Sequence, residues 1–350
     1  MRRKYSKKVF AMLLVLFPMM IAIKIFQYKV LSLKYFTDAY YIQRLVNGNI
    51  NIESKGTAYY NTAIIFKFLK NIFHLSTLKE WSYLLGIIYT PVCFSLLLNK
   101  FKKLDLVNYL FLLASFGLIN IFVFNMSKDI IQFTIFIIIY LVLISKYKNI
   151  TKILLISITL ILETKYFRSY YILILFGFII VCFLYKFLPK TKNKKAYILL
   201  SLMIFLGGIF LSSFIVPSLY NQLINVRDDT VNMLIDVNTT IDNVFENSNY
   251  IFFVINYLIN GVRILFPLEL LLKGPKYILF VIYQLYLSIS IIKTLKKNSA
   301  GNELNMAIII GYFLGSIIFE PDFGSLVRHE STLFLIYLLA FSKKEDVYND

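Results

Sequence analysis

The hydrophobic positions of this chain gather in long, nearly uninterrupted runs that are separated by polar gaps. A helix needs about 20 apolar residues to cross a bilayer. Ten runs reach or approach this length, near residues 9–26, 81–98, 106–124, 130–145, 153–163, 170–188, 196–216, 276–292, 304–319 and 332–342. The fifth and the last are short, and they need neighbouring helices or a thinner bilayer to shield their ends. The pattern predicts an all-α, polytopic membrane helix bundle of about ten spans, with residues 1–350 forming a single domain.

Composition supports this class of protein and excludes several others. Hydrophobic residues make up 59% of the 350 residues and charged residues 16%, whereas a soluble domain is about half apolar and a quarter charged. A soluble enzyme, a secreted disulfide scaffold and a disordered chain are therefore excluded. The two cysteines, Cys93 and Cys182, lie inside apolar runs and are too few for a disulfide framework or a zinc site. We expect no metal and no cofactor.

The net charge of +18 is distributed unevenly over the polar gaps. Alternate gaps, near 1–8, 99–105, 146–152, 186–195, 293–303 and 343–350, hold 21 of the 37 basic residues but only five of the 19 acidic residues. One face thus carries +16 and the other +2, and the positive-inside rule makes the first face cytoplasmic. This predicts a multi-pass membrane protein, in contact with membrane lipids, with both termini in the cytoplasm. Nucleic acid is not an expected partner, because its footprint would be clustered among reading elements.

The opposite face carries the polar residues from which a function can be inferred. Two long regions, 27–80 and 217–275, are predicted to be extracytoplasmic, with interfacial helices at 36–46 and 57–68. Residues 260–269 are apolar but contain Gly261 and Pro267, which predicts an interrupted, re-entrant or interfacial segment that presents Arg263. Three short turns, 125–129, 163–168 and 320–330, are dense in ionisable residues. Such groups at membrane depth are costly and often functional, although interfacial ion pairs are an alternative interpretation.

Arginine is enriched on this outer face. Five of the seven arginines lie there, against 11 of the 30 lysines. Membrane orientation depends on either residue, so it does not explain the difference. The guanidinium group binds phosphate or carboxylate at two points, which lysine cannot do. The distribution indicates an anionic, phosphorylated substrate at the outer face.

Three segments carry a resemblance to a known family. They are Phe36-Thr37-Asp38-Ala39-Tyr40-Tyr41, Ser127-Lys128-Asp129 and Pro321-Asp322-Phe323-Gly324-Ser325-Leu326-Val327-Arg328-His329. With the overall plan of spans, they resemble bacterial polysaccharide polymerases of the Wzy and EpsG type, which share features with the GT-C class of lipid-donor glycosyltransferases. The outer arginines are single and dispersed here, whereas the family's large outer loops contain more of them.

The resemblance implies a substrate and a reaction. The substrate would be an oligosaccharide repeat unit on an undecaprenyl pyrophosphate carrier, and the product a capsular, exopolysaccharide or O-antigen polymer. Other polysaccharide-assembly proteins would be candidate further partners. The reaction requires a group that accepts a proton from the attacking hydroxyl, and cations that stabilise the departing diphosphate. The candidate catalytic residues are His329, Asp38 and Asp322, and the candidate pyrophosphate-binding residues are Arg168, Arg263, Arg328, Lys128 and Lys165.

Two other functions remain open from the sequence. A GT-C-like transferase would add one sugar from a polyprenyl-phosphate donor, with Asp38 as the key base. A flippase or transporter for a lipid-linked sugar would not be an enzyme at all. Transporters often contain inverted repeats, and the sequence contains no convincing internal repeat.

Overall fold

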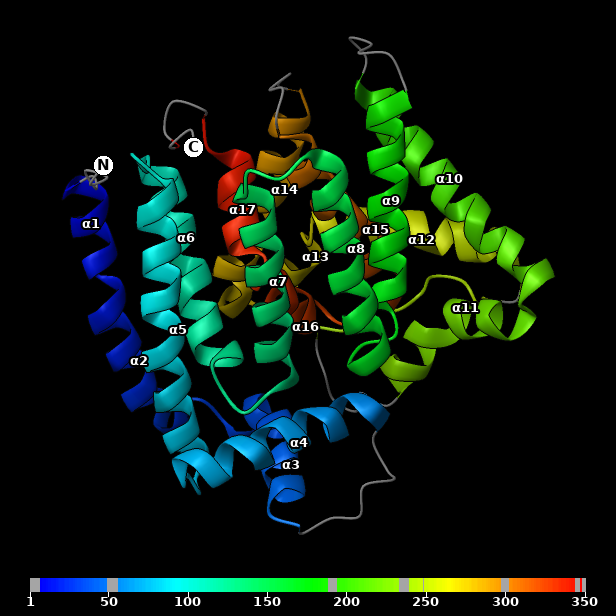
Figure 1. Cartoon of the computed structure of the whole chain (residues 1–350). Helices are drawn as coiled ribbons and strands as arrows, with labels where there is room; N and C mark the ends of the chain where they lie inside the picture. Colours follow the sequence, from blue (N-terminus) through cyan, green and yellow to red (C-terminus); the bar gives the residue numbers. More distant parts are fainter. Residues whose placement is uncertain are drawn as a thin grey trace. The chain divides into compact units, whose positions relative to one another are not determined.

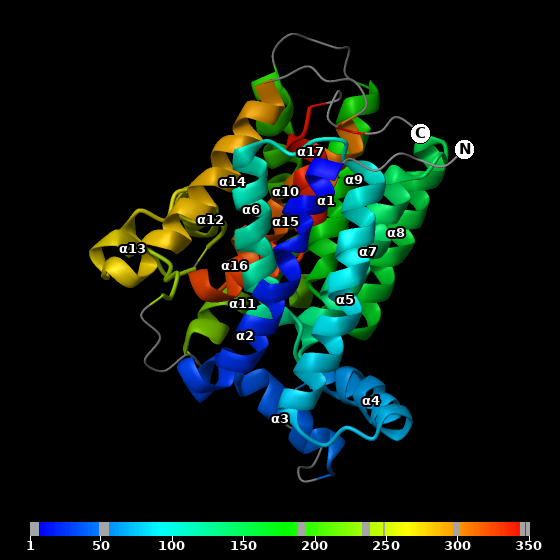
Figure 2. The same ribbon diagram turned by 90° about the vertical axis from the view of Figure 1, so that its left-hand side faces the viewer.

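The computed structural model describes residues 7–48, 56–187, 194–232, 239–247, 249–296, 302–343 and 347 (Figures 1 and 2). Throughout these residues the regular elements are helical, and two isolated bridges, Phe101 with Val347 and Thr240 with Asp322, are the β-type pairs. The chain divides into two compact units. Unit 1 comprises Met1–Lys148, Leu162–Ser169 and Arg328–Asp350, and unit 2 comprises Asn149–Ile161 and Tyr170–Val327.

Unit 1 is built mainly from the first half of the chain. Its elements are α1 (Lys7–Leu14), α2 (Leu16–Val30), η1 (Leu33–Phe36), α3 (Thr37–Val46), α4 (Gly56–Phe73), α5 (Leu78–Lys100), α6 (Leu106–Leu118), the π-helix η3 (Ile119–Val123), α7 (Lys128–Ile144) and α17 (Phe334–Phe341). In both views α3 and α4 lie crosswise at one end of this unit, and α1 begins and α17 ends at the opposite end (Figures 1 and 2).

Unit 2 consists of the helices that follow. These are α9 (Tyr171–Phe187), α10 (Lys194–Ile215), α11 (Pro217–Asn232), α12 (Tyr250–Leu265), α13 (Glu269–Leu272), η4 (Pro275–Tyr277), α14 (Ile278–Lys296) and α15 (Glu303–Phe319). Two helices contribute residues to both units, namely α8 (Asn149–Tyr166) and α16 (Phe323–Ser331).

The ten apolar runs coincide with helices, as the hydrophobic pattern predicts. Among the described residues, four helical segments are long and apolar enough to cross a membrane: Lys7–Val30, Leu78–Lys100, Leu106–Val123 and Pro275–Lys296. Four further apolar helices are shorter, at Tyr171–Lys186, Leu199–Ile215, Tyr250–Leu265 and Glu303–Phe319. The protein is therefore an all-helical protein of membrane character. The number of ten spans and their orientation stay predictions.

The side chains of these helices are arranged as expected for lipid surroundings. On α14 the polar residues Gln284 and Ser288 are fully buried, whereas Leu279 is 80% exposed and Ile282 57% exposed. On α5 the buried side includes Ser82 and Thr90. A soluble helix shows the opposite arrangement, with its apolar stripe facing inward. Apolar residues are buried on both helices as well, so the feature that suits a membrane helix is the exposure of its large apolar side chains.

The predicted helices of the first long loop are present. Residues 36–46 and 57–68 fall in or beside α3 and α4, although whether they lie at a membrane interface stays a prediction. The predicted interruption at 260–269 is wrong at its glycine, because α12 continues through Gly261 to Leu265. A Cβ atom at Gly261 would lie only 3.3 Å from Ile317 of α15, so this glycine permits close helix packing. The break occurs instead around Pro267, before α13 begins at Glu269.

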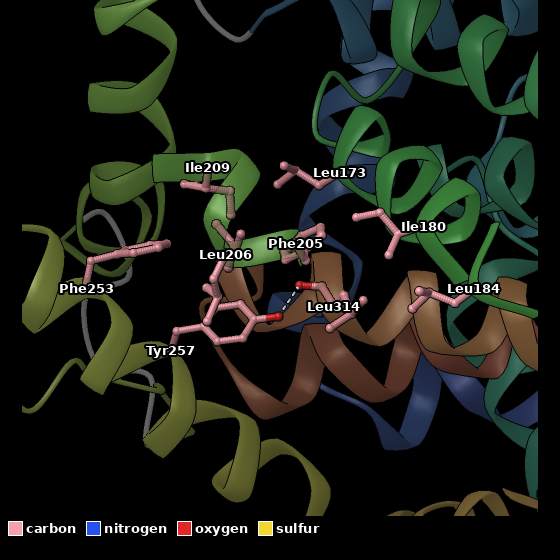
Figure 3. Close-up of a cluster of buried hydrophobic side chains, with 10 residues drawn as sticks. Leu173, Ile180, Leu184, Phe205, Leu206, Ile209, Phe253, Tyr257 and Leu314 are labelled. Atoms are coloured by element: carbon pink, nitrogen blue, oxygen red, sulfur yellow. Dashed lines mark hydrogen bonds between the residues drawn. The ribbon is translucent and has the colours of Figure 1, made fainter. Parts of the chain in front are cut away.

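A hydrophobic cluster holds four helices of unit 2 together (Figure 3). Leu173 of α9, Phe205 of α10, Phe253 of α12 and Leu314 of α15 belong to it. The hydroxyl of Tyr257 donates a hydrogen bond of 2.9 Å to the carbonyl of Leu314, which satisfies the polar end of a buried ring (Figure 3). This core fixes α12 against α15, and both helices line a pocket considered below.

Candidate functional site

Asp129 is the centre of a cluster of ionisable side chains in unit 1. It lies in the first turn of α7 and is 1% exposed. Its Oδ2 lies 2.9 Å from Nε of Arg328 and forms an ion pair with that guanidinium. Its Oδ1 pairs with Arg168 and lies 3.4 Å from Nε2 of His329. Three side chains from two other segments therefore converge on one buried carboxylate.

Asp38 is the second carboxylate of the cluster and is more accessible. It lies in the first turn of α3 and is 26% exposed. Its Oδ2 is 3.8 Å from both Lys128 Nζ and Arg328 NH2, and its Oδ1 accepts a 2.6 Å hydrogen bond from the Tyr59 hydroxyl. Lys128 Nζ also lies 3.8 Å from the centre of the Tyr59 ring, in cation–π contact. Arg328 thus bridges the two carboxylates.

Each side chain is positioned by the end of a helix. Asp38 and Asp129 occupy the first turns of α3 and α7, where the helix dipole favours negative charge. Arg168 follows the end of α8, and Arg328 and His329 lie in the last turn of α16. Gln132, one turn into α7, donates to the carbonyl of His329 and thereby fixes α16 against α7.

The segment that leads into α7 is anchored by a buried lysine. Lys24 of α2 is fully buried and donates hydrogen bonds to the carbonyls of Asn120 and Phe124, at either end of the π-helix η3. A π-helical turn leaves carbonyls without their ordinary helical partners, and the lysine satisfies them. Lys128 and Asp129 follow Phe124 by four and five residues, so this contact helps to set their position.

Exposure increases across the cluster. Asp129 and Arg168 are at most 5% exposed, whereas Lys128 is 20% and Arg328 is 26% exposed. The buried members form a fixed base, and the accessible edge consists of Asp38, Lys128 and Arg328. A ligand from solvent would therefore meet two cations and one carboxylate first.

The charges of the cluster stabilise one another. Burial works to raise the pKa of Asp129, but Arg328, Arg168 and His329 hold the pKa of this carboxyl well below its usual range. For Asp38, burial likewise opposes ionisation, and Lys128, Arg328 and the Tyr59 hydroxyl together keep its pKa lowered. Burial lowers the pKa of Lys128. Both carboxylates are therefore ionised at neutral pH, and Asp38 can accept a hydrogen bond or a proton.

One further carboxyl lies close to the cluster. Glu163 in α8 is fully buried, and neither carboxylate oxygen has a hydrogen-bond partner among the described residues. It interacts electrostatically with Arg168 and Asp129. Within the described part of the chain, no three His, Cys, Asp or Glu side chains are arranged as a metal site.

The structure brings together five of the eight site residues predicted from the sequence: Asp38, Lys128, Arg168, Arg328 and His329. Lys165 is exposed and lies over the ring of Tyr166, outside the contacts of the cluster. The other two belong to unit 2. Asp322 accepts the backbone N–H of Ser325 at the start of α16 and so caps that helix. Arg263 forms a two-point ion pair with Glu269, with both distances 2.8 Å.

Sequence reasoning missed the residue at the centre. Asp129 belongs to the charged turn 125–129, but its neighbour Lys128 is the residue of this turn among the predicted site residues. The available signal was an acidic residue at the start of a long apolar run, where a charge is costly unless it is paired. Tyr59 and Gln132 gave no sequence signal, because their roles depend on contacts with residues 21 and 197 positions away.

Comparison with protein-family models, curated proteins and solved structures found no match to this chain.

Proposed function

We propose that this protein is a glycosyltransferase that polymerises lipid-linked oligosaccharide repeat units at the outer face of the bacterial cytoplasmic membrane. The observation that carries the proposal is the cluster of Lys128, Arg168 and Arg328 around Asp129 and Asp38. Cations outnumber the carboxylates that they contact, and two cations are accessible. Such a group suits the diphosphate of a polyprenyl carrier, which bears negative charge at the membrane surface.

The proposed step requires no external energy source. A hydroxyl oxygen of the acceptor sugar attacks the anomeric carbon of the donor glycan, and the bond from that carbon to the diphosphate oxygen breaks. The electron pair leaves with the diphosphate, where Arg328 and Lys128 stabilise the developing charge. Asp38, the accessible carboxylate, takes the proton of the attacking hydroxyl.

Asp129 has a positioning role in this scheme. It is too buried to contact the substrate, and its ion pairs orient Arg168, Arg328 and His329 from the buried side of the cluster. Arg328 contacts both carboxylates, so its NH2 group can turn from Asp38 toward the diphosphate while the contact between Nε and Asp129 holds the side chain in place. Preorganised charges of this kind act without reorganisation during the reaction.

The test compares surface glycan length in a deletion strain complemented with Arg328→Ala, Arg168→Ala or Asp38→Asn. Each variant is expected to leave single repeat units in place of polymer, with lipid-linked units accumulating. Arg44→Ala is the matched control, because Arg44 is exposed and lies on the same helix as Asp38. Immunoblots of the membrane fraction establish that all variants are present in equal amounts.

The same experiment separates the competing functions. Polymer of normal length in both arginine variants would end the proposal. Mass spectrometry of the carrier lipids of the deletion strain gives the second readout. A carrier-linked glycan lacking one sugar identifies a single-sugar transferase, and a complete unit retained on the inner leaflet identifies a transporter.

A further inference from the structure

Unit 2 contains a polar pocket that the proposed reaction does not use. It lies between α11, α12, α15 and the loop at 239–247. The cavity has a volume of about 10 Å³, which is room for about one water-sized group. Its polar lining residues are Arg227, Asn243, Asn247, Asn256, Tyr257 and Asn260. Leu223 and Ile317 are among the apolar lining residues. We call this feature the Arg227 pocket.

Arg227 is the charged group of this pocket. It is 3% exposed, and its NH2 group donates to the carbonyl of Ile317 in the last turn of α15. That carbonyl has no partner within its own helix, so the contact fixes the guanidinium plane. The NH1 group is buried and has no hydrogen-bond partner among the described residues. A buried guanidinium with an open donor end is costly unless a ligand or solvent satisfies it.

The asparagines form a connected network around this guanidinium. Asn243 and Asn247 donate to the two carboxylate oxygens of Asp228, at 2.6 and 3.0 Å. Asn260 donates to Asn243 at 2.7 Å, and the side chain of Asn256 donates to Asn247 at 2.9 Å. The amide groups are therefore held in fixed orientations. The Oδ1 of Asn256 already accepts the backbone N–H groups of Val244 and Phe245, whereas the Oδ1 of Asn243 accepts from Asn260 and has a second lone pair that suits a hydroxyl group.

We infer that the Arg227 pocket is a binding site for the carboxylate of an acidic sugar, with NH1 of Arg227 as the anion-binding donor and the surrounding amides as hydroxyl-binding groups. The volume admits one water-sized group, which corresponds to one carboxylate oxygen, so the rest of the carboxylate and the sugar ring lie at the mouth of the pocket. That the carboxylate belongs to a glycan rests on the function proposed above.

Charge balance favours a carboxylate over a phosphate. One guanidinium end is open, and the Asp228 carboxylate lies beside it, held by two amides. Arg263, the next cation, is engaged by Glu269. Burial lowers the pKa of Arg227 to about 10, so the group stays charged at neutral pH. Asp228 and Glu320 both interact electrostatically with Arg227, so a phosphate dianion would be repelled more strongly than a monoanion.

The test measures binding of D-glucuronate to the purified full-length protein in detergent, by saturation-transfer NMR. D-glucose is the neutral probe, and inorganic phosphate is the competing anion. We expect a glucuronate signal at least five times that of glucose, which phosphate does not displace. Arg227→Gln is expected to remove the glucuronate signal, and Arg44→Gln, an exposed arginine in unit 1, to retain it.

A second variant keeps the test decisive where Arg227→Gln fails to fold. Leu223 lies one helical turn before Arg227 and also lines the pocket. Leu223→Asp places a tethered carboxylate beside Arg227, which is expected to block glucuronate. Leu223 packs against the hydrophobic cluster of unit 2, so the aspartate and asparagine variants lose the same apolar packing. Leu223→Asn is the uncharged control and is expected to bind.

Three results would overturn the inference: equal binding of glucose and glucuronate, displacement by phosphate, or an unchanged glucuronate signal in Leu223→Asp. The outcome is independent of polymer formation. Arg328→Ala, which tests the proposed function, is expected to abolish polymer but to leave glucuronate binding unchanged. Loss of polymer without a glucuronate signal would thus refute the pocket and spare the function.

Discussion

Asp129 concentrates several opposing physical effects in one side chain. Burial disfavours its charge, and three neighbouring side chains, Arg168, Arg328 and His329, favour it. A buried ion pair contributes little compared with apolar packing, but the loss of one partner leaves the other charge buried and unpaired. Asp129 therefore matters more for the integrity of the site than for contact with substrate. Asp38 is 26% exposed, so its main role is contact with substrate.

Asp129→Asn is expected to lower the free energy of unfolding by about 3–5 kcal/mol, because Arg168 loses its buried carboxylate partner. The measurement is chemical unfolding in detergent, followed by the fluorescence of Trp81, the single tryptophan, which is buried in unit 1. Asp242→Asn, at an exposed position, is the control and should change stability by less than about 0.5 kcal/mol. Equal stability of both variants would contradict the central role of Asp129.

The pH dependence follows from the same residue. The pKa of Asp129 in the folded protein lies below the usual value of 3.8. Its contribution to stability is therefore fully present above that value, and is lost as the pH falls from about 4 through the folded pKa. We expect wild-type stability to decline in this acidic window, and Asp129→Asn to show a smaller decline. Parallel pH profiles of the two proteins would argue against an ionised Asp129.

At the scale of elements, the helices could be predicted from the sequence but their interruptions could not. The ten apolar runs coincide with helices because apolar runs of this length leave the backbone few other ways to satisfy its polar groups in lipid. The break assigned to Gly261 was wrong, since glycine between packed helices can serve close approach as well as chain reversal. The π-helix η3 gave no local signal, because its carbonyls are satisfied by Lys24, about 100 residues away in sequence.

The contact between α9 and α15 offers an element-scale prediction. An added Cβ at Gly311 would lie 2.6 Å from the backbone nitrogen of Phe178 and 2.9 Å from the carbonyl oxygen of Ile174. Backbone atoms cannot move aside, so Gly311→Ala is expected to cost about 1–3 kcal/mol of stability. Gly207→Ala in α10 is the matched control, because nothing lies within 4 Å of its added Cβ, and it should be neutral or stabilising. Thermal melting of the two variants in detergent should differ in this direction, and a reversed order would refute the packing argument.

At the scale of the molecule, the distribution of charged residues predicts how the protein is oriented in the membrane. No feature of the sequence indicates that the chain divides into two units. Two of the four unit boundaries fall within α8 and α16, where the helix is continuous, and the other two lie directly before α8 and between α8 and α9. The candidate site was partly predictable, because Asp38, Lys128, Arg168, Arg328 and His329 stand out as charges beside apolar runs. Their convergence on Asp129 depends on long-range packing, which no local pattern records.

Cysteine labelling tests the predicted orientation. Both native cysteines, Cys93 and Cys182, are buried, so the wild-type protein should react slowly with a membrane-impermeant maleimide. Asn71→Cys on α4 and Lys103→Cys between α5 and α6 place thiols at exposed positions of unit 1. In intact cells, with the outer barrier permeabilised, only Asn71→Cys should be labelled, and lysis should expose Lys103→Cys as well. Labelling of Lys103→Cys but not of Asn71→Cys in intact cells would show that the orientation is opposite to the predicted one.

The way in which Asp129 already occupies its arginine partners has a consequence for selectivity. The carboxylate of Asp129 is part of the same chain, so it competes with any bound anion for these arginines at an effective concentration on the order of millimolar or more. Monovalent anions of the cell envelope gain too little to displace it, whereas a diphosphate has enough oxygens to bind the NH2 group of Arg328 while Nε stays beside Asp129. The same carboxylate competes with the carrier that remains after the transfer, so it lowers the affinity of the site for that product and favours its release.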